Sequence, residues 1–302
     1  MSTLLRTPLL RSTTLGEAFG GTALLKAELL QKTGSFKPRG ILAKLATLSR
    51  EERARGVITV SAGNAAAAVA YGCRLEGIDC LVVMWQGTSD LKAAAARSYG
   101  ATVDREAADP TDAFARLEDL RAASGRAFVH PYDDPVVIEG HSSLSREIVE
   151  DAPETEVIVT GVGGGGLVSG IAVGARGLRV VGVEPEGSAA LHEGLAAGRP
   201  VPVRPDSVAD ALNAPVVGEH CLAVCQENDV ESVLVSEDDI RSGFRFLYER
   251  AKLAAEPGAA AGVGALLAGK VPDVEGKTVA VVVSGGNVAP QTAAAILSSN
   301  EA

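Results

Sequence analysis

Short, continuously apolar runs alternate with longer amphipathic or alanine-rich segments along most of the chain. Apolar runs of about four to eight residues predict buried strands, and longer stretches with apolar residues at helical spacing predict helices. The predicted strands are 57–61, 78–84, 101–106, 127–130, 156–162, 179–185, 231–236 and 277–283, and the predicted helices are 65–77, 89–100, 110–125, 134–151, 163–176, 237–255, 258–269 and 289–299.

This alternation predicts an α/β fold whose largely parallel sheets carry helices on both faces. The predicted helices are long enough to serve as crossovers between parallel strands. Two such series follow one another, so we expect two lobes. Ligands of these folds bind at the carboxyl ends of the strands, and a site is therefore expected in a cleft between the lobes.

Composition narrows the classes of function. Hydrophobic residues make up 46% of the 302 residues and charged residues 22%, which is typical of a globular protein. A net charge of −10 argues against nucleic acid and anionic membranes as partners. The N-terminus lacks a secretory apolar region, and no apolar run reaches the roughly 20 residues of a membrane span. Cys73, Cys80, Cys221 and Cys225 form no C-x2-C pair, so reduced, buried thiols and a cytoplasmic location are expected.

The segment GSFKPRG, residues 34–40, places Lys37 directly before Pro38. Proline suits the first turn of a helix and disfavours the α region for the residue before it. A helix is therefore predicted to begin at Pro38, with Lys37 as its N-cap. N-caps are normally Ser, Thr, Asp or Asn, and a lysine there faces the positive end of the helix dipole. Local stability disfavours this arrangement, which indicates a chemical reason for it.

Four consecutive glycines, Gly163–Gly166, separate a predicted strand from the helix that follows. Their backbone N–H groups are not shielded by side chains, and the helix dipole adds positive potential. The pattern lacks the Gly-Lys-Ser/Thr of a Walker A loop and the spacing of a dinucleotide fingerprint. It favours a phosphate cradle over the alternative, a flexible turn.

Two further strand ends carry polar residues. SAGNAA, residues 61–66, offers backbone N–H groups and the amide of Asn64 to a carboxylate, or else an ordinary N-cap at Asn64. SGGN, residues 284–287, places Ser284 at the carboxyl edge of the last strand, or else forms a plain turn. Taken alone, each is at least as consistent with the ordinary alternative.

Together these motifs resemble the fold-type II pyridoxal-phosphate (PLP) enzymes, specifically the threonine/serine dehydratase and serine racemase group. The resemblance covers nearly the whole chain. It implies a two-lobed fold similar to tryptophan synthase β, with a PLP-binding lobe of residues 1–50 plus 138–302, a smaller inserted lobe of residues 51–137, and a homodimer. The motifs that carry it are RTPLL, GSFKPRG, SAGN, HPYDDPVVIEG, GVGGGGLVSG, VGVEPEG, VADALNAP, AAEPGAAAG and VVVSGGN.

The resemblance implies a role for each motif. Lys37 would form the Schiff base with PLP and act as the catalytic base. The other cofactor contacts that it implies are Phe36 beside the ring, Asn64 at the phenolic oxygen, Gly163, Gly164, Gly165, Gly166 and Leu167 at the phosphate, Glu256 as an orienting group, and Ser284, also counted as catalytic, at the pyridine nitrogen. The substrate carboxylate would lie against Ser61, Ala62, Gly63, Asn64 and Ala65.

These roles imply an ammonia-lyase that converts an L-β-hydroxy amino acid such as threonine or serine into a 2-oxo acid and ammonia. Racemases of the group commonly carry a serine where this chain has Ala62, and a methyl group cannot transfer a proton. The alternatives are racemisation, β-replacement, threonine-synthase-like chemistry or a catalytically silent PLP-binding protein. Lys37 argues against the last of these.

Departures from the family pattern lie on the substrate side. Ala65, Ala66 and Ala67 replace the usual His and Gly/Ala-Gln, and the segment 141–144 (HSSL) replaces Gly-Gln-Gly-Thr. His141 and the two serines after it are expected either to contact the substrate or to form a helix start with serine caps.

The resemblance lends little support to a divalent or monovalent cation. Glu184 matches a metal ligand of some relatives, but Ala190 replaces the aspartate that would accompany it. No metal is predicted, and Glu184 is the one candidate ligand.

Overall fold

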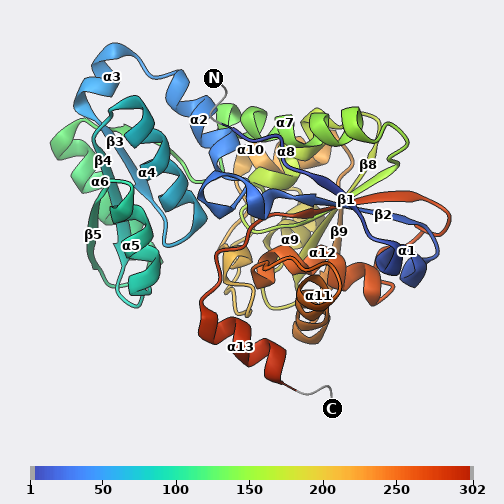
Figure 1. Ribbon diagram of the computed structural model, residues 1–302. Coiled ribbons are helices and arrows are strands. Elements are labelled where there is room, and N and C mark those ends of the chain that lie inside the picture. The colour runs from blue at the N-terminus through green and yellow to red at the C-terminus, as the bar shows by residue number, and fades with distance from the viewer. Residues whose placement is uncertain (1–3, 300–302) are drawn as a thin grey trace.

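The larger sheet runs through β1 (Leu9–Arg11), β2 (Thr22–Ala27), β10 (Thr278–Val283), β7 (Val157–Gly161), β8 (Arg179–Pro185) and β9 (Glu231–Val235), in this spatial order (Figure 1). The computed structural model describes residues 4–299. All neighbouring strands of this sheet are parallel except the edge strand β1, which is antiparallel to β2.

Alternate side chains of the central strands enter two separate cores. Val279, Val281 and Val283 of β10 pack with α11 (Glu237–Glu249) and α12 (Pro257–Leu267). Ala280 and Val282 face the opposite core, with α7 (Pro135–Asp151) and α8 (Gly166–Gly174). Because successive side chains of a strand point to opposite faces, burial on both faces explains the uninterrupted apolar runs of the sequence.

The smaller sheet contains β5 (Thr102–Ala107), β4 (Cys80–Trp85), β3 (Val57–Val60) and β6 (Ala127–Phe128), all parallel (Figure 1). One face packs against α4 (Asn64–Glu76) and α5 (Asp90–Ser98), and the other against α6 (Pro110–Ser124). The core on the α4 side also includes Ile41 and Leu45 of α2 (Pro38–Ala46). The helix that begins after Lys37 therefore contributes to the packing of this smaller lobe.

The predicted α/β fold with largely parallel sheets and helices on both faces is confirmed, and each predicted strand is present. The helix expected over 237–255 ends at Glu249, and Lys252 adopts a left-handed backbone with φ of 59°. The sequence pattern also missed β1, β2 and four helices. In β2 the cause is Lys26, a completely buried charge whose ammonium lies 2.6 Å from a Glu147 carboxylate oxygen. The missed helices are α1 (Thr13–Phe19), α3 (Arg50–Arg55), α9 (Ala190–Ala197) and α10 (Glu219–Glu227). The last predicted helix is α13 (Pro290–Ser298).

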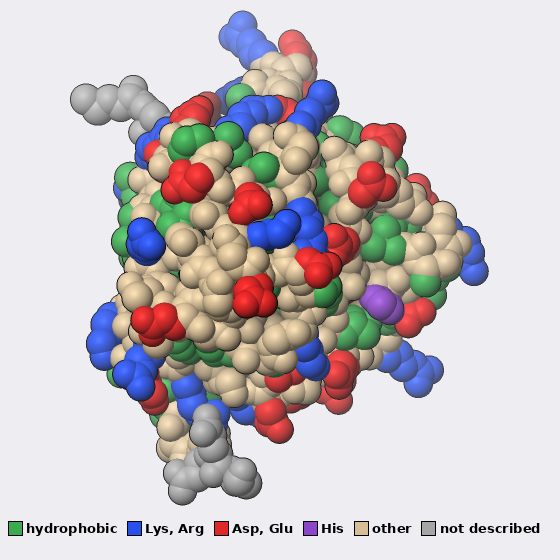
Figure 2. All heavy atoms as spheres, turned by 90° about the vertical axis from the view of Figure 1, so that its right-hand side faces the viewer, with side chains coloured by type: hydrophobic (Ala, Val, Ile, Leu, Met, Phe, Trp, Pro, Cys, Tyr) green, Lys and Arg blue, Asp and Glu red, His purple; other side chains and the backbone are tan. Residues whose placement is uncertain are grey.

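Charged side chains of both signs are interspersed on the face of the larger lobe that Figure 2 shows. Ion pairs at the surface include those of Arg6 with Glu150 and Asp151. Within residues 4–299, no helix combines the length and the apolar character needed to cross a membrane.

Helices α11 and α12 approach so closely that their glycines leave no room for a side chain. A Cβ atom on Gly264 would lie well inside contact distance of the Asp239 carbonyl oxygen, and one on Gly243 would meet the Ala260 carbonyl oxygen. Both obstacles are backbone atoms, which cannot move without shifting a helix.

Gly264→Ala should therefore destabilise the protein by roughly 1–3 kcal/mol, because the added methyl overpacks the helix crossing. In an open helix position the same change would stabilise by up to about 1 kcal/mol. The matched control is Ala115→Gly at an exposed position in α6, which should cost about 1 kcal/mol or less through helix propensity alone. Urea unfolding measures both, and a stabilised Gly264→Ala variant would contradict the crossing geometry.

Candidate active site

Lys37 lies at the start of α2, as the sequence predicts, and Pro38 is the first helical residue. The expectation that Pro38 keeps Lys37 out of the α region is wrong, because its φ and ψ are −51° and −38°. The turn is already closed there: the Phe36 carbonyl accepts from Arg39 N–H at 3.0 Å, and the Lys37 carbonyl accepts from Ile41 N–H at 3.2 Å. These bonds offset the local preference of a residue before proline.

The Lys37 amine points toward the segment that precedes α7. Its Nζ donates to the Pro131 carbonyl oxygen at 2.7 Å and lies 5.1 Å from the centre of the Phe36 ring. Burial lowers the pKa of Lys37 to about 8, although Cys221 and Glu256 oppose the shift. A buried amine with a lowered pKa is able to act as a nucleophile and a base near neutral pH.

The tetraglycine turn joins β7 to α8. Gly165 has a φ of 96°, a left-handed conformation that glycine adopts without strain, and no side chain caps the first turn of α8. The Tyr132 ring covers the turn so closely that a Cβ atom on Gly164 would lie 2.6 Å from the ring. Uncapped N–H groups at the start of a helix suit an anion.

Backbone hydrogen bonds join the Lys37 segment to the turn after β10. Phe36 N–H donates to the Ser284 carbonyl at 3.0 Å, and Gly286 N–H donates to the Gly34 carbonyl at 2.9 Å. The Asn287 amide donates to the Thr33 carbonyl at 2.7 Å. Lys37 and Ser284 are far apart in the sequence, and these bonds bring their segments together at the carboxyl end of β10.

Asn64 does not cap α4, so the ordinary N-cap alternative is wrong: Gly63 is the N-cap residue and no side chain caps this helix. The Asn64 amide donates to Glu256 Oε1 at 2.8 Å, and its carbonyl oxygen accepts from the Asn287 amide at 2.8 Å. The turn before it is tightened by Ser61 Oγ, which accepts from Gly63 N–H at 3.1 Å. Asn64 therefore joins the smaller lobe to the larger one.

Glu256 is buried at the start of α12, and a Cβ atom on Gly285 would collide with its carboxylate. Burial raises the pKa of Glu256 to about 7, and the hydrogen bond from Asn64 opposes this shift. Around Asn64, Ala62 is half-buried and Ala65 is fully buried.

His141, Ser142 and Ser143 lie in the middle of α7, so the expectation of a helix start with serine caps is wrong. The helix begins at Pro135, and Asp134 is its cap, accepting from Val136 N–H. The serine hydroxyls donate to the backbone carbonyls of Glu139 and Gly140 within the helix. His141 is completely buried, with its ring 4.8 Å from that of Phe36.

The carboxylate of Glu184 accepts hydrogen bonds from three protein donors. Its two oxygens accept from the backbone N–H groups of Leu191 at 2.7 Å and His192 at 2.8 Å, which begin α9, and from the Ser232 hydroxyl at 3.0 Å. Burial raises its pKa to about 7. Within residues 4–299, no group of three or more His, Cys, Asp or Glu side chains is placed to hold a metal ion.

Sequence reasoning assigned no role to two residues at the site. Tyr132, which covers the glycines, carried only the weak signal of its place in the motif HPYDDPVVIEG. Cys221 lies at the start of α10 against Gly165, fully buried, and no sequence pattern pointed to it.

A protein-family comparison agrees with this geometry. The family described as "Pyridoxal-phosphate dependent enzyme" matches residues 2–285. The chain belongs to this family. As a PLP-dependent enzyme it is similar over 94% of its length to the L-threonine ammonia-lyase of Thermotoga maritima, with 40% identity over 71% of that relative. It is 38% identical to the phenylserine dehydratase of Ralstonia pickettii, over 90% of this chain and 85% of that one. The solved structure of maize serine racemase superposes with a TM-score of 0.92 at 30% identity, covering 96% of this chain and 90% of that one.

The residues present fit PLP. The cofactor needs an amine for its aldehyde and hydrogen-bond donors for its phosphate, and the site offers the Lys37 amine and the uncapped, glycine-lined start of α8. Cys221 lies next to the second of these features: its side chain packs against Gly165, and its thiol is 3.6 Å from the Tyr132 carbonyl oxygen.

Glu256 should make stability depend on pH. Its pKa is raised from 4.5 to about 7 in the folded protein, so folding favours the protonated carboxyl. The contribution of the protonated Glu256 carboxyl to the free energy of unfolding is fully present below about pH 4.5 and is lost as the pH rises to about 7. Glu256→Gln lacks this titration, so its free energy of unfolding should improve relative to wild type as the pH rises through that interval, by roughly 1.4 kcal/mol for each pH unit between the unfolded and folded pKa values. Urea unfolding of the ligand-free proteins at the two ends of the interval measures the difference. Parallel stabilities of the two proteins would contradict the raised pKa.

Proposed function

We propose that this PLP-dependent enzyme is an ammonia-lyase that converts an L-β-hydroxy amino acid, such as threonine or serine, into a 2-oxo acid and ammonia. The observation that carries the proposal is the Lys37 amine, whose pKa is lowered to about 8 and which donates to the Pro131 carbonyl; the next residue, Tyr132, covers the uncapped start of α8. Relatives named threonine ammonia-lyase and phenylserine dehydratase support this choice of reaction.

The proposed cofactor contacts are those that the family resemblance implies. Lys37 would hold PLP covalently through its ε-amine, with Phe36 beside the ring. The backbone from Gly163 to Leu167 would bind the phosphate. The remaining contacts are Asn64 at the phenolic oxygen, Glu256 holding the Asn64 amide, and Ser284 at the pyridine nitrogen. Bound PLP supplies an electron sink that stabilises negative charge at the substrate Cα.

Lys37 would then move the proton. Once released by the substrate amine, its ε-amine accepts the proton from Cα. With a pKa of about 8, about a tenth of such amines are neutral at pH 7, compared with fewer than about one in a thousand for an ordinary lysine. Burial thus supplies the base that the reaction needs.

The turn from Ser61 to Ala65 would bind the substrate carboxylate. It lies at the carboxyl end of β3 and opens α4, whose first turn has no side-chain cap, so its N–H groups are suited to a carboxylate. Asn64, the fourth residue of this turn, already contacts Glu256 of the larger lobe. We do not place His141 in this substrate site, because its side chain is fully buried.

The proposed reaction is written without a cation, and the one candidate ligand, Glu184, accepts from the start of α9. The homodimer and the cytoplasmic location expected from the sequence remain predictions.

Lys37→Ala should abolish both turnover and the visible absorbance of bound PLP, because the amine that holds the cofactor and removes the proton is gone. The assays are absorbance spectra and the release of ammonia and 2-oxo acid from threonine, serine, 3-hydroxyaspartate and β-aryl serines. Lys32→Ala is the matched control, since this exposed lysine lies in the same segment and should leave both readouts unchanged. Full activity in Lys37→Ala would overturn the proposal. If the wild-type protein instead performs β-replacement or only binds PLP, it should show the absorbance of bound PLP but release no 2-oxo acid.

Racemisation is the second candidate, favoured by the likeness to maize serine racemase. It needs a second acid or base on the face of the substrate opposite Lys37, and the half-buried Ala62 offers only a methyl group there. We expect deamination of L-serine to exceed its racemisation by at least about tenfold, a difference of ~1.4 kcal/mol in barrier. Ala62→Ser should raise the racemisation rate in a chiral chromatography assay. Equal rates in the wild-type enzyme would overturn this order.

A further inference from the structure

The first turn of α2 lacks the side-chain cap that most helix starts use. The first four backbone N–H groups of a helix have no partner within the helix and need one elsewhere. Lys37 stands at the N-cap position, and its side chain makes no capping bond. Pro38 has no N–H, Arg39 N–H donates to the Phe36 carbonyl, and Ile41 N–H donates to the Lys37 carbonyl. Among the N–H groups that follow Lys37 in this turn, that of Gly40 is the one that remains.

His141 of α7 supplies the missing acceptor. Its Nδ1 accepts from Gly40 N–H at 3.1 Å, across 101 residues of sequence. The space for the ring depends on two glycines: a Cβ atom on Gly40 would lie 2.6 Å from His141 Cε1, and one on Gly170 of α8 would lie 2.5 Å from His141 Cβ. The imidazole thus lies where α2, α7 and α8 meet, edge-on to Phe36.

The protonation state follows from the hydrogen bond. Because Nδ1 accepts, the ring is neutral and its proton is on Nε2, which has no hydrogen-bond partner in the part of the chain that the structure describes. Burial lowers the pKa of His141 well below its usual value, and the charges of Lys37 and Arg39 act in the same direction. An unpartnered buried donor is unfavourable, so stability alone does not explain a histidine at this position.

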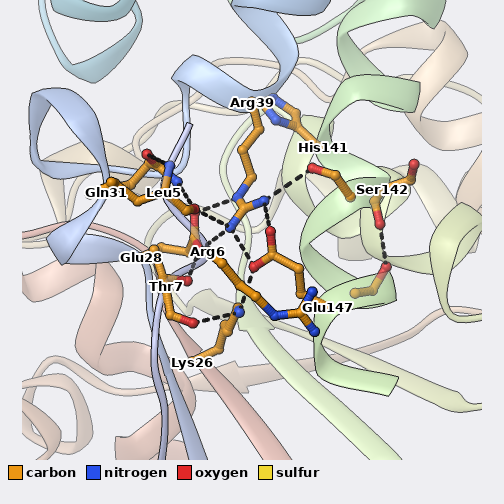
Figure 3. Close-up of polar contacts among 12 residues, drawn as sticks. Leu5, Arg6, Thr7, Lys26, Glu28, Gln31, Arg39, His141, Ser142 and Glu147 are labelled. Carbon is orange, nitrogen blue, oxygen red and sulfur yellow. Dashed lines mark hydrogen bonds and ion pairs between the residues drawn. The ribbon is translucent and has the colours of Figure 1, made fainter. Parts of the chain in front are cut away.

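A buried ionic cluster holds the same turn on its other side (Figure 3). The Arg39 guanidinium lies 2.8 Å from Glu28 Oε2 and 2.7 Å from Glu147 Oε1, and it donates to the Ser143 hydroxyl at 3.2 Å. Lys26 completes the cluster through Glu147. The residues two and three positions after Lys37 are therefore both anchored to α7, through Glu147 and His141.

We propose that His141 is a positioning residue that caps the helix start from another helix and so holds the Lys37 amine in its buried place. The N-cap position is taken by the lysine, so the acceptor has to come from another element. Loss of the acceptor frees Gly40 N–H and lets the first turn of α2 reach water, which also exposes the amine at its head. The importance of this role for catalysis rests on the proposed function, but the environment of the Lys37 amine can be measured through its pKa without assuming that function.

The test compares two substitutions of nearly equal shape. His141→Asn retains an acceptor near the Nδ1 position, whereas His141→Leu has none. The readout is the pKa of Lys37 in cofactor-free protein, from competitive acetylation with acetic anhydride across pH and peptide mass spectrometry, with the exposed Lys32 as internal reference. Wild type and His141→Asn should titrate near pH 8 at Lys37, and His141→Leu should titrate at least about one pH unit higher, toward the value of a solvated lysine.

A purely structural role for His141 predicts another result, in which both variants lose thermal stability and Lys37 keeps its wild-type pKa in both. That result, or a shift in His141→Asn as large as in His141→Leu, would overturn the proposal. If His141→Leu does not fold, His141→Ala replaces it, because alanine also lacks the acceptor and cannot overpack the helix contact. Full turnover in Lys37→Ala would remove the proposed function, while the acetylation result would still decide the role of His141.

Discussion

Burial of the Lys37 amine is the constraint on which the arrangement of the site depends. An ammonium group taken out of water is costly, and the structure meets this cost by lowering its pKa and by directing it at the Pro131 carbonyl. The amine stays there only if its backbone is fixed. Segments around residues 131, 141 and 284 provide this support through backbone and side-chain hydrogen bonds.

Several helix starts around the site have no cap from the side chain of their own N-cap residue, and the same is true of α9, α10 and α13. The helices α3, α5, α6 and α11 have a serine or aspartate cap of their own at the N-terminus. By contrast, α2, α4, α8 and α12 have no side-chain cap from their N-cap residue. An uncapped start presents free N–H groups and positive potential, which suits the binding of phosphate and carboxylate. These starts lack the local stability that a cap provides, and α2 regains part of it through His141, which accepts from Gly40 N–H.

Much of the fold follows from local patterns. Apolar runs buried on both faces specified the central strands, and Pro38 specified the start of α2. Elements stabilised by distant partners were not predicted: β2 contains the buried Lys26, whose ammonium pairs with Glu147 of α7 and donates to the Thr7 carbonyl. An N-cap at Asn64 was the ordinary alternative because asparagine commonly caps helices. Its amide instead donates to the carboxylate of Glu256, 192 residues away.

By itself the sequence determined the α/β class, the family and the residues offered for chemistry, because periodicity and motif order are local properties of the chain. Only the tertiary structure decided what these residues touch. It placed His141 behind Phe36 and against Gly40, gave both Glu184 oxygens to α9, and set Tyr132 over the glycines. Such contacts depend on how helices far apart in sequence approach one another, and in this protein glycines on the facing helices set that distance.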